Sequence, residues 1–200
     1  MYTISHTMGL LSKIFGFKQR NAECNNTPSA NYPEEYRQIL KFNSILESLL
    51  KEDRFIARSD YKQLVDTYAA LPDFIETLKK SKMLKTYVET NNLNVMNLHR
   101  FLDTYKQLAD IATVPEIIRQ HNDFFIQKHI KDEKIYLDNI LKECDPNILL
   151  DNEQREVVLS NEDYTLVIAG AGAGKTTTVA AKVRYLVEKQ GVFPENILVI

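Results

Sequence analysis

The residues with the clearest chemical potential form one short run, Ala169-Gly-Ala-Gly-Ala-Gly-Lys-Thr-Thr177. Glycine at every second position allows the backbone to come close to a ligand and to adopt a positive φ where one is needed. Lys175 supplies a positive charge for the β- and γ-phosphates of a nucleotide, and the Thr176 hydroxyl is placed to ligate Mg²⁺. The pattern therefore predicts a loop that binds a triphosphate.

The segments on either side of this loop have the patterns of a strand and a helix. Tyr164–Ile168 is rich in β-branched and aromatic residues, which is typical of a buried strand, and a helical pattern starts at Lys175. The N-terminus of such a helix directs free N–H groups and the positive end of its dipole at an anion. This order of strand, loop and helix is the context of the phosphate-loop (Walker A) motif. The alternative is a glycine-rich turn that binds nothing.

The motif also predicts which residues contact the nucleotide. Lys175 and Thr176 are the predicted catalytic residues, and Thr176 is the predicted metal ligand. The strict motif begins with glycine where this chain has Ala169, and a methyl group at the end of a strand is sterically mild. The predicted contacts with the phosphates come from Ala169, Gly170, Ala171, Gly172, Ala173, Gly174, Lys175, Thr176 and Thr177.

The last residues of the chain predict a second strand. Gly191 is placed to end the helix, Pro194 begins a turn, and Ile197–Ile200 is an apolar run. Together these segments predict a right-handed βαβ unit, so we expect residues 147–200 to be the beginning of an α/β P-loop NTPase domain. A parallel sheet of only two strands has an open edge, and we therefore expect a longer protein of which this is the N-terminal part.

The preceding residues predict an all-α module over residues 33–146. Apolar residues recur there at helical spacing, as in Tyr36, Ile39 and Leu40, and no alternating strand pattern is present. Residues 1–32 are predicted to be a loosely ordered arm and linker, since residues 21–31 are polar and contain proline. A short apolar stretch within this arm leaves a transient contact with a membrane or a partner as the alternative.

Composition restricts the class of protein. The 200 residues are 44% hydrophobic and 26% charged with a net charge of −2, which is typical of a soluble globular protein. No apolar run approaches the roughly 18 residues of a membrane span, so no stable membrane association is expected. Cys24 and Cys144 are far apart, which favours a reducing cytoplasm over a disulfide framework. His121 and His129 lie two helical turns apart, too distant for the usual close-spaced metal pair.

One stretch of the helical module is basic. Its side chains could bind the phosphate backbone of a nucleic acid, or they could form a solvated helix face. The residues concerned are Lys79, Lys80, Lys82, Lys85 and Arg100.

The segment before the loop makes the prediction of function more specific. The run Leu150-Asp-Asn-Glu-Gln-Arg155, a spacer, and then Ala-Gly-Ala-Gly-Ala-Gly-Lys-Thr resemble the start of superfamily 1 DNA helicases of the UvrD/Rep type. This resemblance implies a RecA-like fold, ATP and Mg²⁺ as cofactors, and 3′→5′ movement on single-stranded or duplex DNA. It also implies that Gln154 contacts adenine, and an amide offers the donor and acceptor that this needs. The family has Ser where this chain has Ala173, which removes a hydroxyl contact and keeps the backbone amide.

Two narrower interpretations remain open. The long helical extension before Leu150 is similar to that of the helicase IV subgroup. It is also similar in layout to RNA-polymerase-associated helicase-like proteins, in which the helical module would dock on RNA polymerase. A phosphate-loop ATPase of another family is the third alternative, and it would make Gln154 a coincidence.

Overall fold

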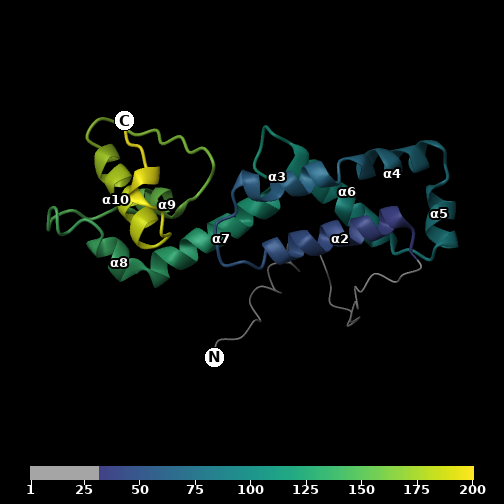
Figure 1. Ribbon diagram of the computed structural model, residues 1–200, viewed down its shortest axis with the longest axis horizontal. Coiled ribbons are helices and arrows are strands. Elements are labelled where there is room, and N and C mark those ends of the chain that lie inside the picture. The colour runs from purple at the N-terminus through teal and green to yellow at the C-terminus, as the bar shows by residue number, and fades with distance from the viewer. Residues whose placement is uncertain (1–31) are drawn as a thin grey trace, which may run out of the picture. The chain divides into compact units, whose positions relative to one another are not determined.

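The computed structural model describes residues 32–200, and the predicted arm therefore lies, except for Tyr32, outside the described residues. Within this range every regular element is helical (Figure 1). Contacts divide the described chain into two compact units. The first unit comprises residues 32–52 and 59–119, and the second unit comprises residues 53–58 and 120–200. No helix of the described chain is long and apolar enough to cross a membrane.

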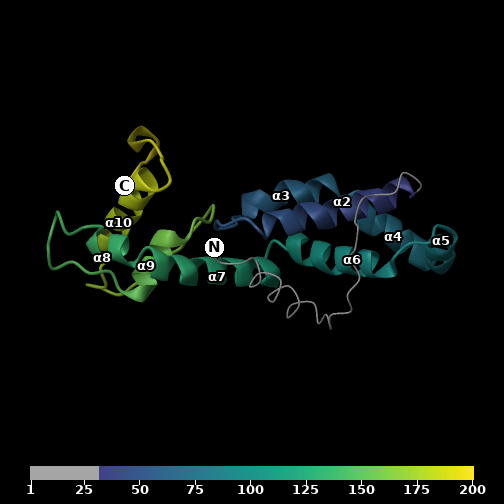
Figure 2. The ribbon, with the colours of Figure 1, turned by 90° about the horizontal axis from the view of Figure 1, so that it is seen from below.

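The first unit is a helical assembly in which α2 and α6 lie side by side (Figures 1 and 2). Glu34 and Glu35 in the first turn of α2 complement the positive end of its dipole. The Asn94 side chain caps α6 by accepting from the Met96 N–H at 3.0 Å, and the Tyr36 hydroxyl accepts from the Asn94 N–H at 3.1 Å. The helices are α2 (Glu34–Leu49), α3 (Arg58–Thr67), α4 (Ala70–Lys80), α5 (Leu84–Thr90) and α6 (Val95–Ala109).

Aromatic side chains form the centre of this unit. Phe42 of α2 and Phe101 of α6 are both fully buried, and their rings meet edge to face with centroids 4.9 Å apart. Tyr68 meets Phe42 in the same way, with the centroids 5.6 Å apart. Edge-to-face contact aligns the positive ring edge with the negative ring face, which adds to the burial of apolar area.

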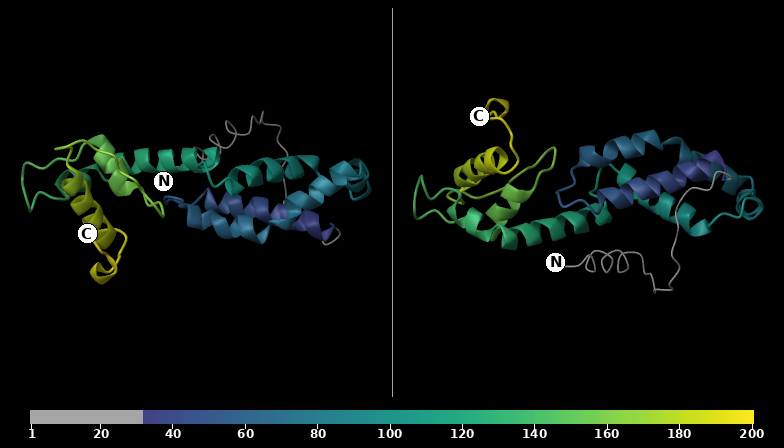
Figure 3. Two further views of the ribbon diagram at one scale, coloured as in Figure 1. Left: turned by 90° about the horizontal axis from the view of Figure 1, so that it is seen from above. Right: turned by 60° about the horizontal axis from the view of Figure 1, so that its bottom comes forward.

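The second unit contains most of α7 and the elements that follow it. Its core joins α8 to α9 and α10, which lie side by side (Figure 3). Leu137 and Ile140 contribute from the α8 region, Val158 and Leu159 from α9, and Ala181 from α10. The elements are α7 (Glu116–Asp132), α8 (Lys134–Asn139), α9 (Asn152–Leu159), α10 (Lys175–Glu188) and a 3₁₀ turn, η1 (Pro194–Asn196).

Residues 53–58 belong to the second unit although they connect helices of the first. Asn122 is buried and makes both hydrogen bonds of an amide with one residue: its Oδ1 accepts from the Ile56 N–H at 2.8 Å, and its Nδ2 donates to the Ile56 carbonyl at 2.9 Å. The Arg58 N–H donates to the Glu162 carboxylate at 2.8 Å. These bonds satisfy backbone groups that would otherwise be buried without partners.

The predicted α/β fold class is wrong for this structure. No strand is present anywhere in residues 32–200. The run at 164–168, expected to be a buried strand, exposes 94% of Tyr164 and 89% of Ile168, and Leu198 of the second run is 82% exposed. A strand needs a neighbouring strand to pair its N–H and C=O groups, and neither run has one in the described chain.

Two other predictions concern helices and domains. The helix predicted from Lys175 is present as α10, and residues 33–146 contain helices and no strand. The contacts group residues 120–146 with the C-terminal segment, and the predicted domain boundary at 146 stays a prediction.

Candidate functional site

The candidate site is built on the glycine loop, residues 169–174, which precedes α10. Gly172 and Gly174 have φ values of 77° and 75°, in the left-handed region that favours glycine, whereas Gly170 does not. Gly174 is the N-cap of α10, and its carbonyl accepts from the Thr178 N–H at 2.8 Å. The glycine loop therefore turns directly into a helix whose first N–H groups are available to an anion.

Lys175 and Thr176 lie on the first turn of α10, and both are exposed. The Lys175 ammonium folds back over the glycine loop, where Nζ donates to the carbonyls of Ala169 at 2.9 Å and Gly170 at 3.1 Å. These contacts hold a full positive charge over the start of the loop. The arrangement combines a cation and helix N–H groups at one place, which is the donor set that a polyphosphate requires.

Gln154 lies against the same loop although it is far from it in sequence. Its Nε2 donates to the Ala173 carbonyl at 3.3 Å, and its Oε1 accepts from the Asp151 N–H at 3.0 Å. The Asp151 carboxylate accepts from the Gln154 N–H at 2.8 Å, which completes a capping box at the start of α9. An amide oxygen has two lone pairs and an amide nitrogen two protons, so each end of Gln154 keeps one capacity for a ligand.

The contact between Gln154 and the glycine loop leaves no space for a side chain at residue 174. A Cβ added to Gly174 would lie 2.5 Å from the Gln154 Nε2. Gly174 is therefore required for its conformation and for the approach of Gln154. The structure thus brings together the predicted adenine-contacting residue and the predicted phosphate-binding loop.

Arg155 is a buried residue of the site that the sequence analysis assigned no role. Its Nε donates to the Leu150 carbonyl at 2.9 Å, and its Nη2 donates to the Asp138 carboxylate at 2.6 Å. Hydrogen bonds from Lys134 and then Arg155 hold the pKa of Asp138 below its usual value, so this carboxylate is ionised at neutral pH. The adjacent Gln-Arg pair was visible in the sequence, but nothing there identified Asp138 as the partner.

Lys182 links the two helices of the site. It is partly buried on α10 and donates from Nζ to the carbonyls of Val158, at 2.9 Å, and Ser160, at the end of α9. Burial lowers the pKa of this lysine to about 8. A cation at the C-terminus of α9 interacts favourably with the negative end of the helix dipole. Lys182 therefore fixes α10, which carries Lys175, against α9, which carries Gln154.

The basic stretch of the first unit does not form a uniformly positive face. Lys79 lies 3.6 Å from Glu76, Lys85 lies 3.8 Å from Glu89, and Arg100 pairs with Glu47. These carboxylates offset three of the five charges that a phosphate backbone would use, which favours the solvated helix face. In residues 32–200 no group of three or more His, Cys, Asp or Glu residues is arranged to hold a metal ion.

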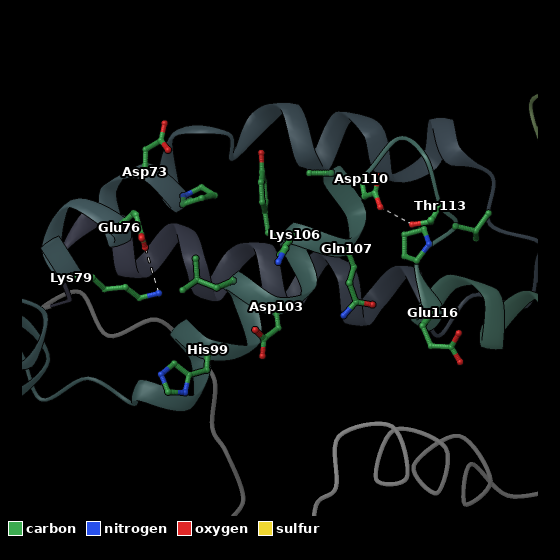
Figure 4. A pocket seen from close by; sticks show the side chains of 16 residues that line it. Asp73, Glu76, Lys79, His99, Asp103, Lys106, Gln107, Asp110, Thr113 and Glu116 are labelled. Atoms are coloured by element: carbon green, nitrogen blue, oxygen red, sulfur yellow. Dashed lines mark hydrogen bonds and ion pairs between the residues drawn. The ribbon is translucent and has the colours of Figure 1, made fainter.

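The first unit has a groove between α4 and α6, with a volume of about 1360 Å³ (Figure 4). Its lining carries more carboxylates than ammonium groups, and Asp110 accepts from the Thr113 hydroxyl at 2.8 Å. An acidic lining repels phosphate, so the groove does not fit a nucleotide or nucleic acid. The charged residues that line it are Asp73, Glu76, Lys79, Asp103, Lys106, Asp110 and Glu116.

Comparison with known proteins agrees with the geometry at the glycine loop. Residues 150–200 match the family described as the UvrD/REP helicase N-terminal domain. The chain is 42% identical over 52 residues to a probable DNA helicase II homolog of Mycoplasma capricolum, and 38% identical over 55 residues to the putative ATP-dependent DNA helicase YjcD of Bacillus subtilis. It is 41% identical over 51 residues to the ATP-dependent DNA helicase PcrA of Staphylococcus epidermidis.

These similarities are confined to a short segment. They cover 26% to 28% of this chain and 7% of each of the three relatives. No solved structure matches the chain significantly. The matched segment includes Gln154, the glycine loop and Lys175, whereas α2 to α8 lie outside it.

Proposed function

We propose that this chain, whose residues 150–200 match the UvrD/REP helicase N-terminal domain, is part of an ATP-dependent DNA helicase. The observation that carries the proposal is the contact between Gln154 and the glycine loop at 3.3 Å, from Nε2 to the Ala173 carbonyl. It brings the amide to which we assign the reading of adenine against the loop to which we assign the binding of phosphate. The three relatives described above are each named as a known, probable or putative DNA helicase, which supports the same function.

The proposed roles of the residues follow from their chemistry. The N–H groups of residues 169–177 and the Lys175 ammonium bind the triphosphate of ATP, and Thr176 ligates Mg²⁺. The remaining donor and acceptor of Gln154 read the edge of adenine. Bound Mg²⁺ would neutralise charge on the phosphates.

The DNA partner and the direction of movement are further parts of this proposal. We infer that the whole protein moves on single-stranded DNA in the 3′→5′ direction and acts in the cytoplasm. Membership of the helicase IV subgroup stays a prediction. No feature of residues 32–200 favours docking on RNA polymerase over this function.

The substitution Lys175→Ala in the whole protein tests the proposal. It removes the one side-chain charge that we assign to the phosphates, so we expect DNA-stimulated ATP hydrolysis to fall about 100-fold or more, as when a group that stabilises transition-state charge is removed. Turnover is measured by phosphate release with and without single-stranded DNA. Lys62→Ala, a change at an exposed lysine of α3 outside the basic stretch, is the control and keeps full turnover. Undiminished hydrolysis by Lys175→Ala would refute the assignment.

A further inference from the structure

We propose that Asp138 is a positioning residue that orients Gln154 through Arg155 and thereby sets the preference for adenine over other bases. The inference rests on the proposed function. It assigns a role at the nucleotide site to α8, a helix outside the segment that matches the helicase family.

The first step is the way in which Arg155 is held. The residue is 7% exposed, and its guanidinium makes two hydrogen bonds in different directions, to the Leu150 carbonyl and to the Asp138 carboxylate. A guanidinium is planar and carries its donors in a rigid fork, so fixing one donor also fixes the direction of the other. Asp138 therefore determines how Arg155 meets the Leu150 carbonyl.

The second step is a single peptide plane. The Leu150 carbonyl and the Asp151 N–H belong to the same peptide group, which is planar, with the two groups pointing to opposite sides. The Arg155 Nε donates to the oxygen of this peptide group at 2.9 Å. The N–H of the same peptide group, which is that of Asp151, donates to the Gln154 Oε1 at 3.0 Å. Fixing the carbonyl therefore fixes the N–H that orients the Gln154 amide.

The third step is what the amide does once it is oriented. With Oε1 held by Asp151, the Nε2 of Gln154 faces the Ala173 carbonyl of the glycine loop. The same bond decides which end of the amide presents a donor to the ligand and which presents an acceptor. Without it the amide is held only by the longer bond from Nε2 to the Ala173 carbonyl, at 3.3 Å, and a rotated amide presents donor and acceptor in the wrong order for adenine.

Substitution of Asp138 would remove the first contact of this series, the hydrogen bond from Arg155 to the Asp138 carboxylate. The Arg155 side chain is 9% exposed, and without its carboxylate it would be a nearly buried cation with no counter-charge. Such a group turns toward water, because burying an unpaired charge is unfavourable. Arg155 would then leave the Leu150 carbonyl.

The experiment compares nucleotide affinities of the whole protein and its Asp138→Ala variant, using ATP, GTP and inorganic tripolyphosphate as competing ligands. One neutral hydrogen bond contributes about 1 kcal/mol, so we expect the affinity for ATP to fall about fivefold. The affinities for GTP and tripolyphosphate stay unchanged, since Gln154 does not read them. Asp138→Asn keeps an oxygen acceptor for Arg155 and is expected to show a smaller loss, which provides a second variant if Asp138→Ala folds poorly.

Lys134→Ala is the matched control. Lys134 is a mostly exposed residue that donates to the other oxygen of the Asp138 carboxylate at 2.7 Å without contacting Arg155. Its removal should leave the ratio of ATP to GTP affinity at the wild-type value. An equal loss of ATP, GTP and tripolyphosphate affinity in Asp138→Ala would indicate a purely structural role and overturn the inference.

A double variant separates failure of this inference from failure of the proposed function. If Asp138 acts through Gln154, then Asp138→Ala has no further effect on the ATP to GTP ratio in a Gln154→Ala background. If Gln154→Ala lowers the ratio and Asp138→Ala does not, the inference is wrong and the function stands. If the wild-type protein binds no nucleotide, the proposed function itself fails.

Discussion

Different kinds of contact join the helices within the first unit and the elements around the glycine loop within the second unit. In the first unit, helices far apart in sequence meet through buried aromatic rings, such as Phe42 and Phe101. In the second unit an apolar core is also present, but the elements around the glycine loop are joined by polar side chains that bond to backbone carbonyls. Gln154, Arg155 and Lys182 each make such a contact.

The difference has a physical reason. Apolar contacts are non-directional and stabilise a unit without fixing the orientation of a particular group. Hydrogen bonds are directional, so they can hold an exposed loop in the geometry that a ligand needs. The second unit also exposes apolar residues at 164–168 and 198–200, whereas the apolar residues of α2 and α6 in the first unit are largely buried. We therefore expect substitutions in the first unit to affect stability and those around the loop to affect binding.

The largest effect on stability is expected from Phe42→Ala in the first unit. The side chain is fully buried, and removal of a buried aromatic ring lowers the free energy of unfolding by about 3–5 kcal/mol. Urea denaturation measures the loss, and Ile45→Ala, at a residue of the same helix that is 40% exposed, should lose much less. The affinity of the still-folded variant for ATP should not change. A parallel loss of ATP affinity would break the distinction between the two units.

An intermediate effect is expected from Gly174→Ala. A left-handed conformation costs a residue with a Cβ about 1–2 kcal/mol, and the added methyl group would also displace Gln154, so both stability and ATP affinity should fall. Thermal unfolding and ATP titration measure the two losses.

Substitutions at two other glycines distinguish the effect of the left-handed conformation from the effect of displacing Gln154. Gly191 has a φ of 66° with no atom within 4 Å of an added Cβ, so Gly191→Ala should lose stability and keep its ATP affinity. Gly170 has neither a positive φ nor a close neighbour, so Gly170→Ala should keep its stability. Equal ATP affinity in the Gly174 and Gly191 variants would argue against a role for Gln154 at the loop.

The smallest effect is a pH dependence caused by Lys182. Its pKa is about 8 in the folded protein and about 10.4 in an unfolded chain, so between these values the unfolded state binds more protons. The Lys182 contribution to stability therefore rises with pH in this window. The raised pKa values of partly buried Tyr87 and buried Tyr185, about 12, act in the opposite direction only above pH 10.

Denaturation at pH 7, 8, 9 and 10 of the wild type and of Lys182→Met measures this contribution. Relative to the variant, the wild type should gain stability between pH 8 and pH 10. A constant difference between the two proteins across this range would show that Lys182 does not titrate in the folded state.

Helices were predictable from the sequence because their hydrogen bonds are local. The spacing of Tyr36 and Ile39 and the start of α10 at Lys175 each reflect contacts within one segment. The two apolar runs at 164–168 and 197–200 were predicted as strands and are not, because strand formation depends on a partner segment that a local pattern does not specify. The association of residues 53–58 with the second unit was likewise not predictable, since it depends on side chains that are distant in sequence, such as Asn122 and Glu162.

The sequence by itself determined which groups are available for the proposed chemistry: the glycines, Lys175 and Thr176 in one run, and Gln154 upstream of it. Those assignments need only residue types and spacing, since the reactive groups are attached to a short segment. Only the tertiary structure decided how the groups meet. The contact of Gln154 with the glycine loop and the bond from Arg155 to Asp138 join residues separated in the chain. Such contacts depend on how α8, α9 and α10 share one core, which local sequence patterns do not record.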